Sequence, residues 1–490
     1  MRTLRIKITV AFIILLFSPL TAVFGAKPVF EQLGAYIEFS LPGGIKTDTL
    51  TLYLIREYSF NYLGREAIST SADEKGIFRF TLPALEAPGR IAFHLNNSKS
   101  SLMDAYYIEP GDSVFISYDL SGSGKQVFTG KGSVKFTCKL ELENLQKRGV
   151  NEMQKIPDLR FMILKPGIEH IELIYRRLDY IAQRQLSLLD TYKSSMSLQM
   201  YELFNADINA YRMERKYFNT WYTASSVNDS LRNEIHQLFK SLPLPSVYQV
   251  KDSIAWQSKN YLAALIQKAT AEIYFKHGKR SLTNLYQQLK GSLSGLLRDK
   301  VVTAFLLSNP TGEYGEFEMT LKDALSYVKH PSSRNLLQSQ YHAFAEKAPA
   351  FPFDLPDPEG KHYRLADLQD KILVIDFWFN GCSGCILAAK DIETHVIPYF
   401  KDNERIKFIS INLDRNKDTW LKALSGGKYT VSGAVNLFTE GLAFDHPMIK
   451  FYNIQACPKL LILKNGFVFA ANPNAEGRYL KELIDRAISL

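Results

Sequence analysis

Cysteine is scarce in this chain: there are only four in 490 residues, at positions 138, 382, 385 and 457. An exported protein held together by disulfides would need many more, so cysteine does not provide a structural framework. Long apolar runs are also rare. After residue 26, no segment approaches the roughly 20 apolar residues that span a membrane. No dense block of Lys and Arg is present either, so the sequence does not predict binding to nucleic acid.

The first 26 residues have the features of a secretory signal. A basic start, Arg2 to Lys7, precedes the apolar stretch Ile8 to Phe17, and small residues end at Gly25 and Ala26. We expect cleavage after Gly25 or Ala26; an uncleaved anchor is the alternative. Removal of the three basic residues would lower the net charge from +9 to +6. That balance predicts an ordinary solvated surface.

The rest of the chain is too long for one core and divides into three parts by pattern. Residues 27–135 alternate as β-strands do, with turn signals such as Pro110-Gly111-Asp112 between them, and predict an antiparallel β-sandwich-like domain or a small barrel. Its strands are expected at 36–39, 50–55, 77–81, 91–95 and 114–118. Residues 136–345 carry apolar residues at helical spacing. Their helices are expected at 159–192, 198–222, 230–240, 253–277 and 282–307.

A proline-rich segment then leads into residues 346–490, where strands and helices alternate. This order predicts a mixed sheet flanked by helices. Strands are expected at 372–378, 406–412, 434–438, 459–464 and 467–471, and helices at 384–400, 416–425, 446–453 and 477–488. Asn465-Gly466 is a strong hairpin signal between the last two strands.

The pair Cys382 and Cys385 lies where the first of these strands turns into a helix. A Cys-x-x-Cys pair at such a junction is typical of a redox-active dithiol. Cys382 is expected at the N-terminus of the helix, where free backbone N–H groups and the helix dipole favour a thiolate. Cys385 lies one turn further on and could resolve a mixed disulfide.

Residues 346–490 resemble the TlpA/ResA-like thiol–disulfide oxidoreductases of the thioredoxin superfamily. The residues that carry the resemblance are Ala348-Pro349-Ala350-Phe351, Leu365-Ala366-Asp367-Leu368, Asp376-Phe377-Trp378, Cys382-Ser383-Gly384-Cys385 and Ala456-Cys457-Pro458-Lys459-Leu460-Leu461. The resemblance implies a C-terminal α/β thioredoxin-like fold. A weaker likeness, around Tyr107 to Val114, extends to the N-terminal β domain.

The resemblance also implies roles for single residues. Cys382 is the nucleophile and Cys385 the resolving thiol. Asp376 matches the buried acid behind the second cysteine. A carboxyl in an apolar strand is costly to ionise, so Asp376 could exchange a proton with Cys385. The alternative is a carboxyl that only holds the end of the strand by hydrogen bonds.

Pro458 matches the family's cis-proline, and with Trp378, Gly381 and Cys457 it is expected to border the substrate-binding surface. Three residues depart from the family pattern. Cys457 stands where Thr, Val or Ile is more frequent, Gly381 stands where thioredoxins often have Trp, and Gly384 replaces a common proline. The substrate preference and the redox potential therefore stay open.

Cys457 has three possible roles. It could be a small buried side chain that shapes the site, an alternative disulfide partner for Cys382, or part of a three-cysteine metal or iron–sulfur site. His395, on the following helix, is expected to be a surface residue rather than a fourth ligand. Cys138 is expected to be an isolated buried thiol.

The sequence thus predicts an exported thiol–disulfide oxidoreductase of the periplasm or cell envelope that needs no cofactor or metal. By resemblance, its partners are a membrane thiol donor and oxidised envelope proteins. Two alternatives differ in class. The chain could bind a partner or ligand and use the thioredoxin-like domain only for docking. It could also be a thiol peroxidase, although no threonine stands three residues before Cys382 or Cys385, where peroxidases place one, and Asn380 does not supply it. The oligomeric state is not predicted.

Overall fold

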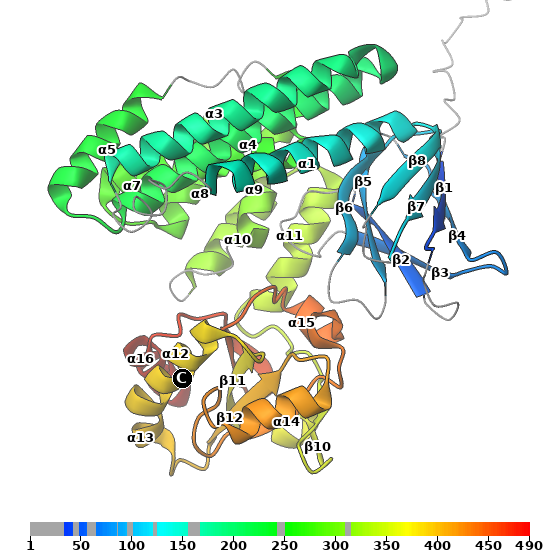
Figure 1. Ribbon diagram of the computed structural model, residues 1–490. Coiled ribbons are helices and arrows are strands. Elements are labelled where there is room, and N and C mark those ends of the chain that lie inside the picture. The colour runs from blue at the N-terminus through cyan, green and yellow to red at the C-terminus, as the bar shows by residue number, and fades with distance from the viewer. Residues whose placement is uncertain are drawn as a thin grey trace, which may run out of the picture.

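The computed structural model describes residues 34–42, 49–55, 65–85, 87–95, 101–120, 125–154, 167–242, 250–308 and 315–490. The predicted signal, residues 1–26, lies outside these ranges, as does the beginning of the helix predicted at 159–192. No helix in the described ranges is both long and apolar enough to cross a membrane. Figure 1 shows a β domain beside a group of helices, with a second domain next to them.

The N-terminal domain consists of two four-stranded sheets with the orders β4-β1-β7-β8 and β3-β2-β5-β6. Side chains from both sheets, among them Ile37, Leu52 and Phe93, are fully buried in one core, so the domain is a β-sandwich. Its strands are β1 (Ala35–Ser40), β2 (Thr49–Ile55), β3 (Arg65–Ser71), β4 (Ile77–Leu82), β5 (Gly89–Leu95), β6 (Ser101–Ile108), β7 (Ser113–Tyr118) and β8 (Gln126–Lys131).

The prediction of an entirely antiparallel domain is wrong for one pair of strands. β1 and β7 run parallel, with Ile37 opposite Val114. The chain places β2, β3, β5 and β6 in the other sheet before β7 returns, and such a long connection lets β7 enter from the same end as β1. The other neighbours in the first sheet, β1 with β4 and β7 with β8, are antiparallel.

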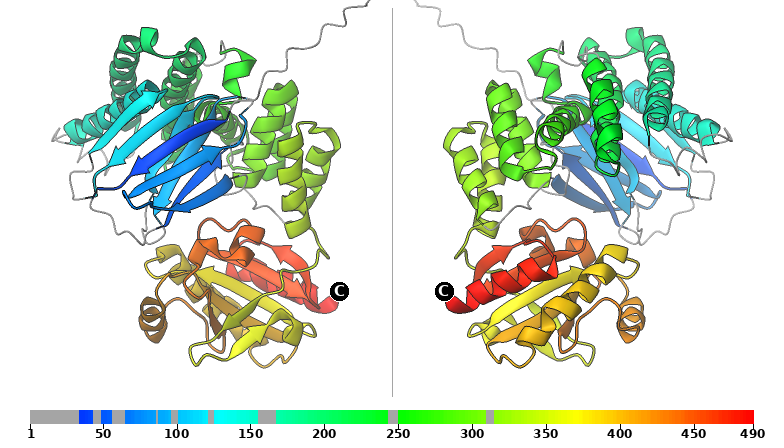
Figure 2. Two further views of the ribbon diagram at one scale, coloured as in Figure 1. Left: turned by 90° about the vertical axis from the view of Figure 1, so that its right-hand side faces the viewer. Right: turned by 90° about the vertical axis from the view of Figure 1, so that its left-hand side faces the viewer.

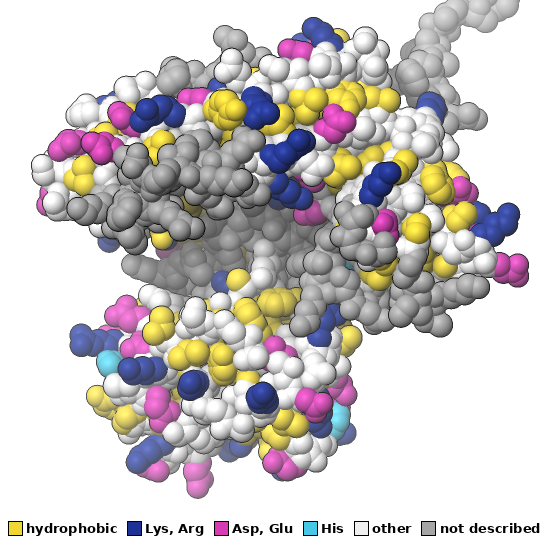
Figure 3. Space-filling view, in the orientation of Figure 1, with side chains coloured by type: hydrophobic (Ala, Val, Ile, Leu, Met, Phe, Trp, Pro, Cys, Tyr) yellow, Lys and Arg dark blue, Asp and Glu magenta, His cyan; other side chains and the backbone are white. Residues whose placement is uncertain are grey.

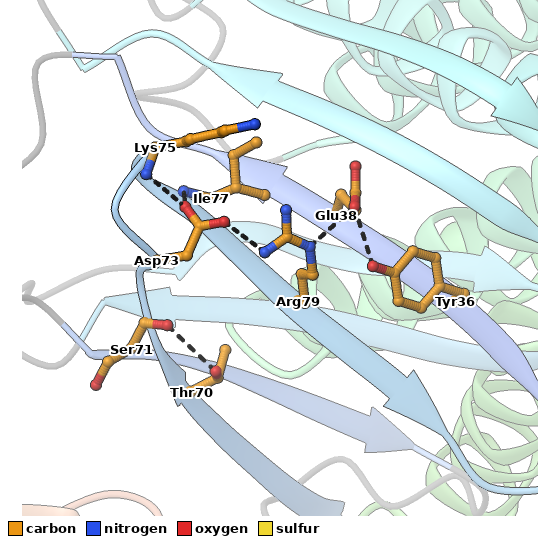
Figure 4. Close-up of polar contacts among 8 residues, drawn as sticks. All are labelled: Tyr36, Glu38, Thr70, Ser71, Asp73, Lys75, Ile77 and Arg79. Atoms are coloured by element: carbon orange, nitrogen blue, oxygen red, sulfur yellow. Dashed lines mark hydrogen bonds and ion pairs between the residues drawn. The ribbon is translucent and has the colours of Figure 1, made fainter.

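A row of polar side chains crosses β1 and β4 on the outer face of this sheet (Figure 4). Glu38 and Arg79 are cross-strand partners, and the guanidinium of Arg79 donates to Glu38 at 3.0 Å and also to Asp73. Asp73 accepts from the backbone N–H groups of Lys75 and Ile77 at 2.8 and 2.9 Å. These bonds fix the turn that leads into β4, which is a structural role.

The middle part of the chain is helical. Its elements are α1 (Ser133–Gln154), α3 (Ile168–Thr191), η1 (Lys193–Ser195), α4 (Leu198–Ala224), α5 (Asp229–Ser241), α6 (Asp252–Ala255), α7 (Lys259–His277), α8 (Leu282–Ser292), α9 (Gly295–Ser308), α10 (Glu316–Tyr327) and α11 (Pro331–Phe344). Short polar side chains are preferred as N-caps because they accept hydrogen bonds from the free N–H groups of the first turn. Four of these helices, α4, α5, α7 and α8, begin in this way, at Ser197, Asn228, Ser258 and Ser281. On the face in Figure 3, basic and acidic side chains are interspersed over the described surface, as the modest net charge predicts.

The C-terminal domain has a five-stranded sheet of order β13-β12-β11-β14-β15. The first three strands are parallel, and β14 and β15 are antiparallel to their neighbours. Its elements are β9 (Asp354–Pro356), β10 (His362–Arg364), η3 (Leu365–Leu368), β11 (Ile372–Trp378), α12 (Ser383–His395), α13 (Ile397–Phe400), β12 (Ile406–Asn412), α14 (Lys417–Ser425), β13 (Val435–Phe438), η4 (Ala443–Asp445), α15 (Pro447–Phe451), β14 (Lys459–Lys464), β15 (Phe467–Ala471) and α16 (Gly477–Ser489).

The two faces of this sheet are covered differently. Ile372 and Val374 of β11 share one core with residues of α12 and α16. Leu373, Ile375 and Phe377 point to the opposite face, because side chains alternate along a strand, and they belong to a core that continues into the helical region. Figure 2 shows the whole C-terminal domain on one side of the sandwich and the helices.

Polar contacts also join the helical region to the C-terminal domain. The side-chain amide of Asn453 donates to the carbonyl oxygen of Leu307 at 3.1 Å and to Oε1 of Gln340 at 3.0 Å. Asn453 and Gln340 are both buried. The backbone N–H of Lys347 donates to the carbonyl of Val468 in β15 at 2.8 Å. The helices and the C-terminal domain therefore form one continuous body.

Candidate active site

The two cysteines lie at the junction between β11 and α12, and the structure joins them by a disulfide. Cys382 is the N-cap of α12, and its sulfur accepts a hydrogen bond from the backbone N–H of Cys385 at 3.1 Å. Cys382 is 5% exposed and Cys385 2%. Cys382 is thus placed at the positive end of a helix, where a thiolate is stabilised.

The turn before Cys382 depends on a glycine. Gly381 has φ +92°, a left-handed conformation that residues with a Cβ rarely adopt. Its backbone N–H donates to the hydroxyl of Tyr429 at 3.0 Å. The N–H of Asn380 donates to the carboxylate of Asp414 at 3.1 Å. These two bonds hold the turn from two loops, one directly after β12 and one after α14. Gly381 leaves the space in front of Cys382 free of a side chain.

Pro458 lies against the cysteine pair, and the Cys457–Pro458 peptide bond is cis. The sulfur of Cys382 is 3.6 Å from the carbonyl oxygen of Cys457. A Cβ built on Gly384 would lie 3.0 Å from Cδ of Pro458. The ring of Pro458 therefore leaves little room for a side chain at Gly384, the residue that stands where a proline is common.

Cys457 is a free thiol, partly exposed. Burial, together with the carboxylate of Asp376, raises the pKa of its thiol to about 12. A thiol with this pKa is almost entirely protonated at neutral pH and is a poor nucleophile. Within the described ranges, no three His, Cys, Asp or Glu side chains are grouped so that they could hold a metal ion. The three possible roles of Cys457 stay predictions; the raised pKa of its thiol makes the role of a nucleophile less favourable.

Asp376 lies behind the disulfide. It follows Ile372 and Val374 at every second position of β11, so its side chain points to the face that α12 covers. The hydroxyl of Ser410 donates to its carboxyl at 3.0 Å. Burial raises the pKa of Asp376 to about 7, and the hydrogen bond from Ser410 offsets only part of that shift. A group with this pKa can accept and release a proton near neutral pH.

A small cavity connects this acid with the second cysteine. Asp376 and Cys385 both line it, together with Tyr429 and Pro458, and its volume is about 20 Å³. Most of its other lining residues, such as Val374, Ile392 and Leu460, are apolar, so the carboxyl of Asp376 lies in a largely apolar enclosed space. Asp376 and Cys385 therefore border the same enclosed space behind the disulfide.

Trp378 is placed differently from a substrate-contacting residue. It is fully buried, and its ring stacks on Tyr429 with the centroids 4.8 Å apart. It belongs to a cluster with both active-site cysteines, Trp420 and Phe438. Trp378 thus packs beneath the active-site turn, on the side of the protein interior. A buried ring in this position does not form part of the exposed surface beside Cys382.

The sequence predicted seven residues as members of one site. The structure places Asp376, Cys382, Cys385, Cys457 and Pro458 together. Gly381 lies in the turn just before Cys382, and Trp378 is buried. The sequence did not point to Ser410 or Tyr429, which come from β12 and from the loop after α14. Neither residue lies in a recognisable pattern. The strand register reveals the role of Ser410: it lies opposite Asp376 across β11 and β12.

The topology of this domain, with its Cys-x-x-Cys helix beside a cis-proline, is that of a thioredoxin-like fold. No family model and no curated protein matches the chain. Solved structures do match. The thioredoxin domain of a thiol–disulfide oxidoreductase from Bacteroides vulgatus is 22% identical, with 29% of this chain and 96% of that chain covered and a TM-score of 0.26. A thiol:disulfide interchange protein from a Bacteroides species is also 22% identical, with 30% of this chain and 93% of that chain covered and a TM-score of 0.26.

A third similar structure is a thiol–disulfide oxidoreductase from Bacteroides fragilis. It is 18% identical, with 28% of this chain and 98% of that chain covered and a TM-score of 0.25. All three scores are low, so the assignment of the fold rests on the strand order and on the site described above.

Proposed function

We propose that this protein is a thiol–disulfide oxidoreductase that uses Cys382 and Cys385 as its redox pair. The observation that carries the proposal is the cysteine pair at the N-terminus of α12, with the carboxyl of Asp376 in the same cavity as Cys385. Exchange requires a nucleophilic thiolate and a second thiol within reach. A nearby base that titrates close to neutral pH serves that second thiol.

The reaction begins with the dithiol form. The thiolate of Cys382 attacks one sulfur of a substrate disulfide. The substrate S–S bond breaks, a mixed disulfide with Cys382 forms, and the released substrate thiolate takes up a proton. The thiol of Cys385 then gives its proton to Asp376 and attacks the sulfur of Cys382.

This second attack releases the other substrate thiolate and forms the Cys382–Cys385 disulfide. Two electrons have passed from the protein to the substrate. A donor dithiol must return them through the reverse exchange, and it is itself oxidised to a disulfide.

We further propose that the protein reduces disulfides in the periplasm or cell envelope and receives electrons from a membrane thiol donor. The secretory pattern of residues 1–26 and the resemblance to TlpA/ResA-like proteins support this setting. Residues 27–345 would then select or orient oxidised envelope proteins. A Cys385→Ser variant should trap those proteins as mixed disulfides with Cys382, and Cys382→Ser is the control that traps none.

The test of the redox pair is a titration of the mature chain in graded thiol/disulfide buffers, with alkylated cysteines counted by mass. We expect a reversible two-electron couple that disappears in Cys382→Ser and persists in Cys138→Ser. Cys138 is a matched control because its thiol is free and fully buried. A potential near −270 mV would support a reductase and one near −120 mV an oxidant. If no reversible couple appears, the domain serves for docking and the proposal fails.

A further inference from the structure

A second cavity lies in the helical region, among α1, α3 and α4, and has a volume of about 220 Å³. None of its lining residues belongs to the C-terminal domain. These three helices lie next to one another in Figure 1. The cavity is therefore separate from the redox site, and nothing in the proposed function uses it.

The lining residues follow from helical spacing. Positions 174, 177, 178, 181, 182 and 185 of α3 and positions 208, 211, 212, 215 and 219 of α4 line the cavity. Residues spaced by three or four positions share one face of a helix. One face of α3 and one face of α4 thus meet at the cavity, and Gln146 of α1 closes one side of it.

Three arginines are among these residues, Arg177, Arg212 and Arg215, and the lining includes no Asp or Glu. The Nε atom of Arg212 is buried and has no hydrogen-bond partner among the described residues. A buried donor without a partner is costly. An anion in the cavity would supply that partner.

The carboxylates near Arg212 and Arg215 compensate these two charges poorly. A guanidinium nitrogen of Arg212 is 3.7 Å from Asp179, and that carboxylate has a closer partner in Lys216 at 2.7 Å. Nε of Arg215 is 3.9 Å from Glu214. Both distances are too long for a good hydrogen bond.

The remaining lining is mixed. Apolar side chains are contributed by Ile174, Leu178, Ile181, Ala182 and Ile208, and polar ones by Gln146, Gln185, Tyr211 and Asn219. A pocket with apolar walls and a few convergent polar groups is typical of a small-molecule site. Three arginines beside such walls suit a ligand that has an anionic group at one end and an apolar body.

We propose that this cavity binds a small amphipathic organic anion, with its carboxylate or phosphate held by Arg177, Arg212 and Arg215. Guanidinium groups bind both kinds of oxyanion through paired N–H donors. The apolar part of the ligand lies against the isoleucine and leucine side chains between α3 and α4. The middle part of the chain is then a ligand-binding module attached to the redox domain.

Isothermal titration calorimetry of the full mature chain tests this site with four probes: octanoate, octyl phosphate, octanol and inorganic phosphate. We expect one equivalent of octanoate or octyl phosphate to bind, and whichever binds more tightly identifies the preferred anionic group. Octanol and inorganic phosphate should each bind at least tenfold more weakly. Equal binding of octanol, or of inorganic phosphate, would overturn the proposal.

The matched variants are Arg212→Gln and Arg184→Gln. Arg184 is also on these helices, but its guanidinium lies over the ring of Tyr180 and it does not line the cavity. We expect at least tenfold weaker binding of the preferred anion for Arg212→Gln and no change for Arg184→Gln. Equal effects of the two substitutions would show only a general charge effect and would refute the site.

A measurement on the unmodified sequence covers the case in which Arg212→Gln does not fold. Phenylglyoxal modifies exposed arginines, and the modified peptides are identified by mass. The preferred anion should protect Arg177, Arg212 and Arg215 at least several-fold and leave Arg184 unprotected. Absence of this selective protection would contradict the proposal independently of any variant.

Discussion

At the scale of single residues, Asp376 illustrates how burial creates a functional group. Its ordinary pKa is 3.8, and burial raises it to about 7 in the folded protein. Between these two values the folded state holds a proton that the unfolded state has released. The free energy of unfolding therefore falls as the pH rises from about 4 to about 7. Above that range, the charged carboxylate destabilises the folded state by up to about 4 kcal/mol.

We therefore predict that Asp376→Asn stabilises the oxidised protein at pH 8 and changes little at pH 4. Urea unfolding at pH 4, 6 and 8 measures the difference. Asp370→Asn is a suitable control because Asp370 is 71% exposed. A stability difference that is the same at all three pH values would contradict the explanation by burial.

The same substitution should slow the release of substrate. With no carboxyl to accept the proton of Cys385, we expect the mixed disulfide to resolve about 10²-fold more slowly. In the wild type, the rate should rise through pH 7 as Asp376 becomes a base, and this step should be missing in Asp376→Asn. Rapid acid quenching followed by alkylation measures the rate. Unchanged resolution would leave Asp376 with a structural role only.

Cys457 differs from the redox pair in its chemistry. Because the pKa of its thiol is raised to about 12, it should take no part in exchange. We predict that Cys457→Ala retains the two-electron couple, with a shift of less than about 30 mV, equivalent to about 1.4 kcal/mol. A redox titration with alkylation measures the shift. Loss of the couple, or a Cys382–Cys457 disulfide in Cys385→Ser, would show that Cys457 participates.

At the scale of elements, the loop after α14 holds the active-site turn. The hydroxyl of Tyr429 accepts from the backbone N–H of Gly381 at 3.0 Å, and its ring stacks on Trp378. Tyr429→Phe keeps the stacking and removes the acceptor. We expect a loss of about 1 kcal/mol in the free energy of unfolding and faster amide hydrogen exchange at Gly381. Tyr399→Phe, at a residue that is 65% exposed, should change neither quantity.

Elements also show what could be predicted from the sequence. The strands β11, β12, β14 and β15 have the predicted bounds, because each is an apolar run with few polar interruptions, and the last two flank Asn465-Gly466. β3 (Arg65–Ser71) was missed because its sequence is largely polar. β6 was missed because Asp104 and Ala105 interrupt its alternation, where Ala105 has φ +54° and the pairing with β5 shifts register.

In the middle region, α1, α10 and α11 were not among the expected helices, and the ends of the expected ones were also placed wrongly in two cases. The helix expected at 282–307 is two helices, α8 and α9, separated at Gly295 with φ +57°. The helix expected at 253–277 is likewise divided into α6 and α7, and Ser258 caps the second. The apolar spacing continues across each break, so the periodicity did not reveal it. The site was easier to predict because most of its residues lie at or near strand ends, in recognisable motifs. Its supporting side chains, Ser410 and Tyr429, were harder to predict because only tertiary packing brings them to the site.

At the scale of the whole molecule, buried contacts join the helical region to the C-terminal domain. Asn453 links them through Leu307 and Gln340. We predict that Asn453→Gly destabilises the protein by about 1–3 kcal/mol, because a buried polar group of Gln340 loses its partner. Glycine accommodates the φ of +49° at this position, so the backbone is not strained. Chemical unfolding measures the loss.

Asn465→Gly provides the matched control for this prediction. Asn465 also has a positive φ, +53°, but it lies in the exposed hairpin turn between β14 and β15. We expect its replacement to change stability much less than that of Asn453. Similar losses for both variants would mean that the amide of Asn453 does not join the two parts.

The hydrogen bond from the N–H of Cys385 to the sulfur of Cys382 has a thermodynamic consequence. The same sulfur is the helix cap and the proposed nucleophile of the exchange. An anionic cap is favoured over a neutral one at this end of a helix, so α12 is held more firmly when Cys382 is a thiolate than when it is in a disulfide. The stability of α12 and the reduction of the Cys382–Cys385 disulfide are therefore thermodynamically coupled. Any change that strengthens the capping of the thiolate makes the reduced form easier to reach and the disulfide more oxidising.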